Sequence, residues 1–171
     1  RRQRQMCIRD RRNSIKTDDE LDILVDIVAS ATGSLTNPTK ISNSFKSMSQ
    51  KSLSDKTIKL YLDYLSDAFL IEKSVRFDVK GKKYINTPAK YYFEDVGLRN
   101  ARLNFRQQEE NHIMENIIYN ELLIRGYNVD VGMVEFNYCN EDKKKVQKQL
   151  EVDFVCNQGS KRLYIQSTLA L

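Results

Sequence analysis

Apolar residues recur every three or four positions in the first part of the chain, which is the spacing of one face of an α-helix. Residues 17–33 carry such a stripe, and its members are Leu21, Leu24, Val25, Ile27 and Val28. Acidic residues fill the first turn of this stretch and Gly33 follows its last turn, as is usual at the start and the end of a helix. We therefore expect a helix within residues 17–33.

Two more helices are expected before the pattern changes. The stretch 37–48 has Pro38 at a helix-initiating position. The stretch 52–74 predicts a third helix that starts near Ser54, and the expected inner face is Ile58, Tyr61, Leu62, Leu65, Phe69 and Leu70. Residues 75–95 then contain two β-like runs around a Lys/Gly turn at residues 80–83. Three helices followed by a hairpin is the order of a winged helix, and a generic small helical domain is the alternative.

The second half of the chain predicts an α/β arrangement. Residues 98–105 indicate a short helix, residues 111–126 a long one, and residues 127–134 a strand. Residues 137–149 are polar and charged, which is typical of a loop or hairpin tip. The stretch EVDFVCNQGSKRLYIQST, residues 151–168, predicts two strands around a turn. Strict alternation puts Glu151 and Asp153 on one face of the first strand, and Val152, Phe154 and Cys156 on the other.

Composition narrows the class of protein. With 171 residues the chain can form one domain or two small ones. No apolar run approaches the length of a membrane span, and no secretory segment is visible. The three cysteines lack metal-ligand spacing, and their odd number argues against a disulfide framework. We expect a cytoplasmic, prokaryote-like protein without a membrane partner, and its oligomeric state is left open.

The formal net charge of +5 is unevenly placed along the chain. Residues 1–11 hold five arginines and one aspartate. The letters MCIRDR in this stretch match the translation of a transposon-type sequencing adapter, so we expect residues 1–11 to be a non-native arm. Without them the net charge is only +1. The basic isoelectric point is therefore no argument for nucleic-acid binding.

The candidate chemistry lies in the carboxylates. The stretch ATGSLTNPTK lacks the second glycine and the GK[ST] ending of a phosphate-binding loop, so this chain alone should not hydrolyse ATP. The single histidine, His112, has no nucleophile partner with a known signature. Phosphodiester cleavage needs a divalent metal, and Mg²⁺ takes oxygen ligands. Glu115 on the long helix, with Asp153 and Gln166 on neighbouring strands, could supply them; ordinary structural polar residues are the alternative.

Several motifs in order support a resemblance to a known family. The segments YLDYLSDAFLI, KYYFEDVGLRNA, ENIIYNELLIRGYNVDVG, EVDFV and LYIQST resemble the C-terminal portion of a prokaryotic family of predicted AAA+ ATPases. The resemblance implies an α+β chain, with a winged helix-turn-helix over residues 12–93 and a PD-(D/E)XK nuclease-like domain of unknown function, C-terminally incomplete, over residues 94–171. In that family an ATP-binding module precedes these domains, and we expect it, with its ATP, outside this sequence.

The resemblance also assigns roles to residues. Glu115 matches the helix acid, Asp153 the first-strand acid and Gln166 the second-strand Glu/Gln of the nuclease motif, while Thr168 stands at the position of its lysine. Glu115 and Asp153 would be the ligands of an Mg²⁺ ion if the site were active. Because a threonine cannot supply the positive charge of a lysine, we expect a vestigial site without nuclease activity.

The leading hypothesis is a nucleic-acid-binding or partner-binding module of an ATPase, which contacts DNA through Lys51, Lys56 and Lys59 of the winged helix. Residues 40–59 hold five lysines against one aspartate, which favours contact with a polyanion. A metal-dependent nuclease and a protein-interaction scaffold are the alternatives.

Overall fold

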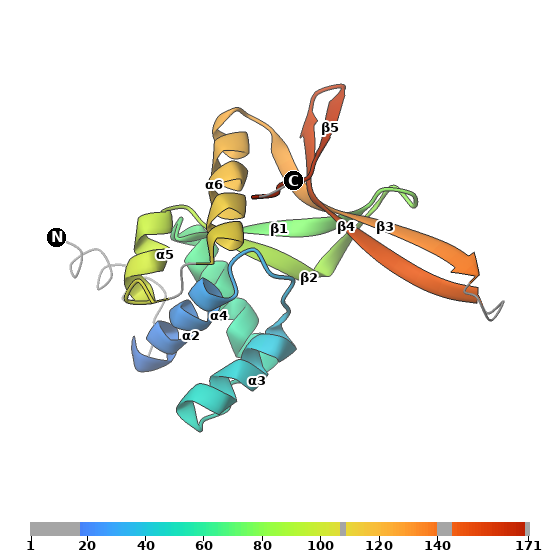
Figure 1. Ribbon diagram of the computed structural model, residues 1–171. Helices are drawn as coiled ribbons and strands as arrows, with labels where there is room; N and C mark the ends of the chain where they lie inside the picture. Colours follow the sequence, from blue (N-terminus) through green and yellow to red (C-terminus); the bar gives the residue numbers. More distant parts are fainter. Residues whose placement is uncertain (1–17, 107–108, 140–144, 170–171) are drawn as a thin grey trace. The chain divides into compact units, whose positions relative to one another are not determined.

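A computed structural model of the chain describes residues 18–106, 109–139 and 145–169. The expected non-native arm, residues 1–11, lies outside this part. The helices are α2 (Asp18–Ser30), α3 (Pro38–Ser49), α4 (Asp55–Asp67), α5 (Val96–Arg102) and α6 (Glu110–Ile124). The strands are β1 (Ile71–Asp78), β2 (Lys83–Phe93), β3 (Asn128–Cys139), β4 (Lys145–Gln158) and β5 (Lys161–Ile165) (Figure 1). The expected α+β class is confirmed.

The chain divides into two compact units. The first contains the described parts of residues 1–31, 37–72 and 93–107, and the second those of residues 32–36, 73–92 and 108–171. Most of the β1–β2 hairpin belongs to the second unit, although the sequence places it in a winged helix. The units therefore do not coincide with the expected boundary after residue 93, and the assignment of two domains on either side of it stays a prediction.

The first unit is built from helices whose ends follow local chemistry. Asn37 caps α3, since its Oδ1 accepts a hydrogen bond of 2.7 Å from the backbone N–H of Lys40. Ser54 caps α4 by accepting one of 3.1 Å from the N–H of Thr57. The apolar stripes of the three longer helices are buried, and among their members are Leu24, Val28, Ile41, Phe45, Ile58 and Leu62. The burial of these residues confirms the helices that the apolar periodicity of the sequence predicts.

Phe69 departs from that periodicity. The sequence places it on the inner face of the third helix, but α4 ends at Asp67 and Phe69 is 72% exposed. Its φ of 53° lies in the left-handed region, where the chain turns out of the helix before β1 begins. The expectation for Phe69 was wrong because a helical stripe does not mark the residue at which a helix ends.

The second unit is a five-stranded sheet with one long helix against it. The strand order is β2-β1-β3-β4-β5. β1 and β3 are parallel, whereas β4 is antiparallel to both β3 and β5. α6 packs on β3 and β4 (Figure 1). Between the helix and the sheet lies a core made of Tyr92, Tyr119, Leu122, Val129, Phe154 and Cys156.

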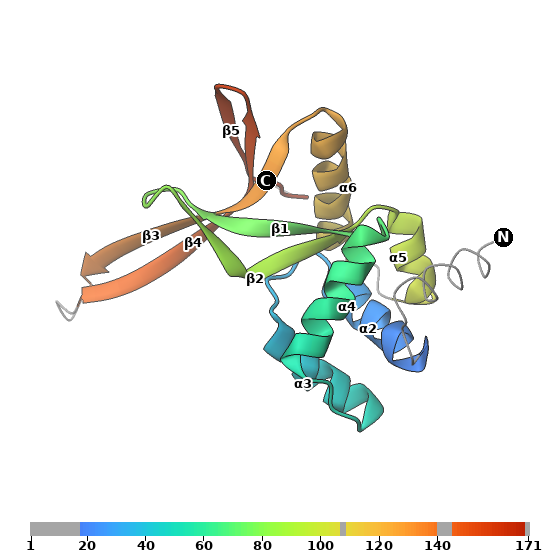
Figure 2. The same ribbon diagram turned by 180° about the vertical axis from the view of Figure 1, so that it is seen from behind.

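The β3–β4 hairpin is longer than the sequence predicts. Residues 137–149 are expected to form a loop or hairpin tip, but β3 continues to Cys139 and β4 begins at Lys145, with paired residues along both strands. Figure 2 shows this ribbon extending past the rest of the sheet. Gln147 and Gln149 each donate a hydrogen bond to Glu135 across the ribbon. These polar contacts lie on one face of the ribbon. The other face carries Phe136 and Tyr138, whose ring centroids are 5.8 Å apart.

A β-bulge on β4 overturns the expected alternation. The pairing of β3 with β4 shifts between Asp130 and Gly132, so that Asp153 and Phe154 together oppose a single residue of β3. Beyond the bulge the side chains change faces. Asp153 and Phe154 therefore lie on the same face of the sheet, toward α6, and not on opposite faces as strict alternation predicts.

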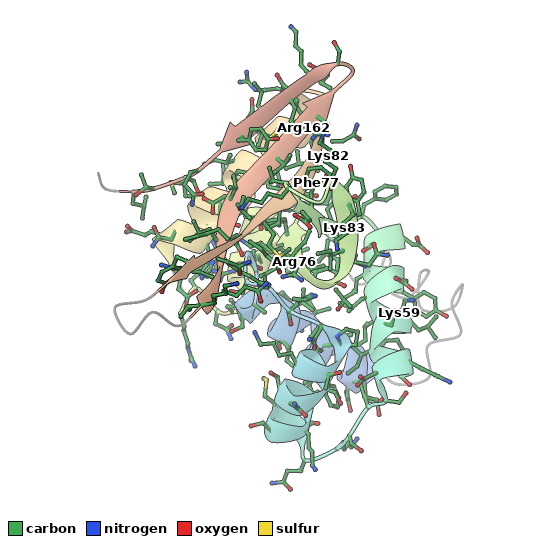
Figure 3. The ribbon with its side chains drawn as sticks, turned by 90° about the vertical axis from the view of Figure 1, so that its right-hand side faces the viewer. Lys59, Arg76, Phe77, Lys82, Lys83 and Arg162 are labelled. Atoms are coloured by element: carbon green, nitrogen blue, oxygen red, sulfur yellow. The ribbon has the colours of Figure 1, made fainter. Side chains whose placement is uncertain are left out.

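The face of the sheet away from α6 is packed closely around a glycine. Gly132 lies opposite Val152 on β4 and Phe77 on β1. A Cβ atom added at Gly132 would come within 2.8 Å of side-chain atoms of both Val152 and Val155. Phe77 and Arg162 lie on this face (Figure 3).

We predict that Gly132→Ala lowers the free energy of unfolding by about 1–3 kcal/mol, because the new methyl group overpacks the two valines. Urea denaturation monitored by circular dichroism measures the change. Gly159→Ala is the matched control, since nothing lies within 4 Å of its Cβ position and only the φ of +58° opposes the side chain. An unchanged stability of Gly132→Ala would contradict the close packing at the bulge.

Candidate functional site

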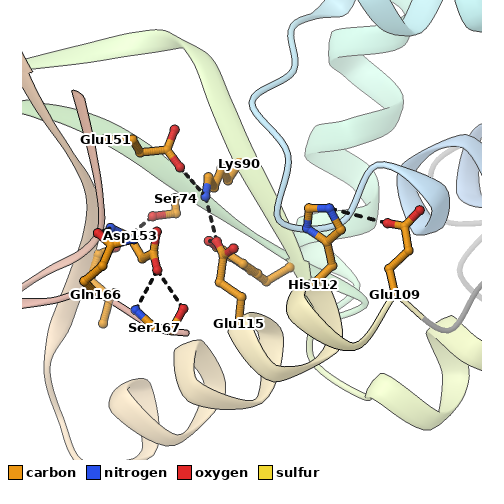
Figure 4. Close-up of polar contacts among 11 residues, drawn as sticks. Ser74, Lys90, Glu109, His112, Glu115, Glu151, Asp153, Gln166 and Ser167 are labelled. Atoms are coloured by element: carbon orange, nitrogen blue, oxygen red, sulfur yellow. Dashed lines mark hydrogen bonds and ion pairs between the residues drawn. The ribbon is translucent and has the colours of Figure 1, made fainter. Parts of the chain in front are cut away.

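Lys90 is at the centre of a buried charge cluster in the second unit. The residue is 3% exposed and lies near the end of β2. Its Nζ is 2.7 Å from Oε1 of Glu115 on α6 and 2.7 Å from Oε1 of Glu151 on β4 (Figure 4). The ammonium group of Lys90 thus connects β2 with both α6 and β4. The sequence does not predict these contacts. The alternation of β2 turns Lys90 and Tyr92 to the same face.

Tyr92 completes the surroundings of Glu115. Its hydroxyl donates a hydrogen bond of 2.5 Å to the same carboxylate oxygen that accepts from Lys90. Burial and the negative charge of Glu115 raise the pKa of the Tyr92 phenol, so the hydroxyl stays protonated as a donor. The ring of Tyr92 stacks on Tyr119 with 4.1 Å between the centroids. Glu115 and Tyr119 are four residues apart on α6 and share its inner face.

The pKa of Lys90 is raised. Burial alone would lower it, but the charges of Glu115 and Glu151 and the hydrogen bonds to them outweigh burial. The segment Thr32–Thr36 packs beside this cluster. Thr36 forms a β-bridge with Ala89, and Gly33 lies against Glu115 and His112. A Cβ at Gly33 would lie 3.0 Å from the His112 ring.

Asp153 has its own set of partners. Its Oδ1 accepts a hydrogen bond of 2.8 Å from Nε2 of Gln166. Its Oδ2 accepts two from Ser167, at 2.8 Å from the backbone N–H and 2.6 Å from the hydroxyl. Asp153 is 8% exposed, and it lies on the face of the sheet against which α6, the helix of Glu115, packs. Both carboxylate oxygens are thus engaged by the segment that follows β5.

The structure brings the three nuclease-motif residues into one unit. Glu115 lies on α6, Asp153 on β4, and Gln166 directly after β5 (Figure 4). Thr168 is exposed and follows the segment that binds Asp153. A lysine does lie against Glu115, namely Lys90, which also contacts Glu151, and sequence reasoning missed both contacts. It also missed Tyr92, which donates to Glu115, and Ser167, which donates to Asp153. The buried end of β2, where a lysine interrupts the run AKYYF, is the one sequence feature that could have indicated Lys90.

These residues do not fit a divalent cation in the arrangement seen. Across the described ranges, no group of three or more His, Cys, Asp or Glu side chains has the geometry of a metal site. The ammonium of Lys90 lies against two of the acids and would repel a second cation. The third acid, Asp153, already accepts three hydrogen bonds.

The predicted DNA-contacting lysines lie in the other unit. Lys51 is in the turn after α3, and Lys56 and Lys59 are on α4. All three are exposed. The remaining lysines of this stretch, Lys40 and Lys46, are exposed on α3. The single acid among them, Asp55, accepts a hydrogen bond of 2.6 Å from the hydroxyl of Thr39.

No helix in the described part of the chain is long and apolar enough to cross a membrane.

Comparison with known proteins places the chain in a family. Residues 5–109 match the family described as Domain of unknown function (DUF8612). The match covers more than half of the chain, and the chain belongs to this family. It includes α2 to α5 with β1 and β2, whereas Glu115, Asp153 and Gln166 lie beyond it. It also begins inside the expected non-native arm.

Two relatives match most of the chain. An uncharacterized protein of Haemophilus influenzae is 37% identical over 155 residues, which cover 91% of this chain and 35% of that protein. An uncharacterized protein of Methanocaldococcus jannaschii is 33% identical over 153 residues, which cover 89% of this chain and 31% of that protein. The chain thus spans about a third of the length of these relatives. No solved structure matches the chain significantly.

We predict that Lys90→Met lowers the free energy of unfolding by about 3–5 kcal/mol, because it leaves the buried carboxylate of Glu115 without its counter-charge. Urea denaturation at neutral pH measures the loss. The double variant Lys90→Met with Glu115→Gln should recover part of it, since the buried side chain at position 115 is then neutral and Glu151, whose side chain is 38% exposed, can be hydrated. Lys145→Met is the control at an exposed position, expected to change stability by less than about 0.5 kcal/mol. A loss below about 1 kcal/mol for Lys90→Met would contradict the cluster.

The same variants carry a pH signature. Because the folded state raises the pKa values of Lys90 and Tyr92, it holds their protons where the unfolded chain releases them. The stability that they contribute is complete below the unfolded values near 10 and is lost as the pH rises through the folded ones. The parent protein should therefore lose stability above about pH 10, and the double variant should lose less.

Proposed function

We propose that this chain, as a member of the DUF8612 family, is a nucleic-acid-binding segment of a larger ATP-dependent protein, and that its nuclease-like site is structural. The observation that supports binding is the exposed lysine surface of the first unit. Five lysines of α3, the following turn and α4 face solvent, and the one acid between them is engaged by Thr39. A local excess of exposed lysines of this kind attracts a phosphate backbone.

The order α2, α3, α4 supports a helix-turn-helix for the first unit. In that motif the N-terminal residues of the last helix approach the base edges. Lys56 and Lys59 lie in the first two turns of α4, three residues apart and so on one face. The helix dipole adds partial positive charge at the same end. We therefore assign the main DNA contact to the start of α4.

The buried cluster supports a structural role for the nuclease-like site. A nuclease site of the kind that the resemblance implies uses a metal to activate water, but the charge of Lys90 already compensates Glu115 and Glu151. The cost of burying Lys90 and Glu115 is offset by the contact between them and by that of Lys90 with the more exposed Glu151. The sequence also has Thr168 where the resembling family has a lysine, so a cation is lacking at the usual position.

The proposal of a larger ATP-dependent protein rests on the resemblance and on length. The relatives are about three times as long as the matched segment, which leaves room for an ATP-binding module. A cytoplasmic location is part of the same proposal. A chain that lacks a phosphate-binding loop would in this scheme act on nucleic acid through the energy that the neighbouring module supplies.

We predict weak, salt-dependent binding to a duplex of about 20 base pairs. The slope of log affinity against log salt should be about −0.9 for each phosphate neutralised. Lys56→Glu with Lys59→Glu should weaken binding at least about tenfold, because each change replaces an attraction to phosphate by a repulsion. Fluorescence anisotropy with a labelled duplex measures both quantities.

Lys145→Glu with Lys148→Glu on β4 is the control for that experiment, since it makes the same change of net charge at exposed positions of the other unit. Equal losses from both pairs would indicate non-specific attraction. An affinity that neither the α4 variant nor salt changes would favour the protein-interaction scaffold.

A metal-dependent nuclease is the second candidate. The observation in its favour is that Glu115, Asp153 and Gln166 do lie in one unit, with both carboxylates on the α6 face of the sheet. For catalysis, Lys90 would have to leave the acids so that a cation could replace it.

We predict that the chain does not cleave single- or double-stranded DNA or RNA in Mg²⁺ or Mn²⁺. A threonine at position 168 supplies no positive charge, and the loss of one such electrostatic stabiliser costs about 100- to 1000-fold in rate. Gel assays compare the parent, Asp153→Ala and Thr168→Lys. Cleavage by the parent that disappears in Asp153→Ala would refute the structural role. Cleavage by Thr168→Lys alone would identify a decayed site.

A further inference from the structure

Three side chains from three different strands form a second surface feature in the second unit. Phe77 of β1 is 3% exposed, and the ring of Tyr84 on β2 lies against it with 5.2 Å between the centroids. The guanidinium carbon of Arg162, on β5, lies 4.7 Å from the centroid of the Phe77 ring. Asn157 fixes that guanidinium, since its Oδ1 accepts a hydrogen bond of 2.6 Å from Nε. We call this group, with Lys82 and Lys83, the Tyr84 patch.

The outward charge of the Tyr84 patch is positive. Lys82 and Lys83 directly precede Tyr84, and both are exposed, as is Arg162 (Figure 3). The two acids beside them are turned inward. Asp78 is 9% exposed, and its Oδ1 accepts hydrogen bonds from the backbone N–H groups of the turn, at 3.1 and 2.9 Å.

The other acid, Asp130, is also 9% exposed and is hydrogen-bonded by the hydroxyl of Tyr84. Burial raises the pKa of its carboxyl group, although the hydrogen bond from Tyr84 and the charge of Arg162 act in the opposite direction. The acid therefore anchors the hydroxyl of Tyr84, and only 9% of Asp130 is exposed to a ligand. A polyanion that approaches the patch meets the exposed Arg162 and Lys82, and it meets Lys83 on the edge strand β2.

Tyr84 gives the patch an aromatic surface as well. The residue is 58% exposed, although its ring edge rests on Phe77 and its hydroxyl on Asp130. A ring that is fixed in place and open to solvent loses little conformational entropy when a second flat group stacks on it. Cations that flank such a ring are the combination that binds unpaired bases and their phosphates. In a duplex the faces of the bases are already stacked and are closed to the ring.

We infer that the Tyr84 patch binds single-stranded nucleic acid, with a base on the ring of Tyr84 and phosphates on Lys82, Lys83 and Arg162. This surface lies in a different unit from the lysines of α4 and takes a different ligand. The inference goes beyond the proposed function, and it shares with that function only the class of polymer. An acidic peptide would satisfy the cations but would leave the ring without a partner.

The test measures anisotropy of a labelled oligothymidine of about 15 nucleotides with the full chain at low salt. Tyr84→Ala should weaken binding about 5- to 150-fold, which corresponds to the loss of one base–aromatic stack. Tyr84→Phe keeps the ring and should stay within about twofold of the parent. Lys82→Ala with Lys83→Ala should make the slope of log affinity against log salt shallower by about 1.4, because each single-strand phosphate that a lysine neutralises adds about 0.7 to that slope.

Matched controls separate the patch from general charge and from misfolding. Lys145→Ala with Lys148→Ala removes the same charge from another exposed site and should retain the parent affinity. Thermal denaturation of each variant shows whether Tyr84→Ala is folded; the exposed lysine pair tests the patch without touching the packed rings. Polyglutamate offers charge without bases, so it should compete far more weakly than unlabelled oligothymidine.

The outcomes also separate this inference from the proposed function. Loss of oligothymidine binding in Tyr84→Ala, with duplex binding lost only in Lys56→Glu with Lys59→Glu, supports both. Duplex binding that depends on α4, with parent-like oligothymidine binding in Tyr84→Ala and in the Lys82/Lys83 variant, overturns the inference alone. Equal competition by polyglutamate also overturns it. A parent chain that binds no nucleic acid at low salt overturns both.

Discussion

The second unit depends on the burial of one ammonium group. Taking the charge of Lys90 out of water is costly unless partners compensate it, and the partners come from elements far apart in the sequence. Glu115 is supplied by α6 and Glu151 by β4. The lysine thus requires β2, α6 and β4 to be in place together. Next to it the rings of Tyr92, Tyr119 and Phe154 supply the apolar contact area that stabilises the same three elements.

The bulge on β4 puts two consecutive side chains, those of Asp153 and Phe154, on the same face of the sheet. In a regular strand Asp153 and Phe154 would point to opposite faces. The extra residue lets Phe154 enter the core under α6 while Asp153, on the same face, is held by Gln166 and Ser167. Gly132 is required next to the bulge, opposite Val152, because a larger residue there would meet Val152 and Val155.

The sequence predicts those helices and strands whose positions are determined by neighbouring residues. The helix starts at Pro38 and near Ser54 and the stripe of α2 need only neighbouring residues, and they are confirmed. The elements that carry Glu115 and Asp153 were predictable for the same reason. Gln166 was expected on the second strand, but β5 ends at Ile165 and Gln166 follows it, because a strand ends where its pairing with β4 ends. The partner of Glu115 was not, because nothing near Lys90 in the sequence shows which helix its strand will face. The bulge and the long β3–β4 ribbon escaped prediction because both depend on pairing between strands.

Burial also changes how the charge of the chain should be understood. The sequence without its first eleven residues sums to only +1, which by itself argues against attraction to a polyanion. Within the described residues, however, the buried charged groups are four acids (Asp78, Glu115, Asp130 and Asp153) and two bases (Lys90 and Arg99). The acids are withdrawn from solvent by turns, by Lys90 and by hydrogen bonds, so the exposed part of the described residues is more basic, by two charges, than the described residues as a whole. Nucleic acid responds to the charge that it can reach, and that charge is set by the fold and not by the composition.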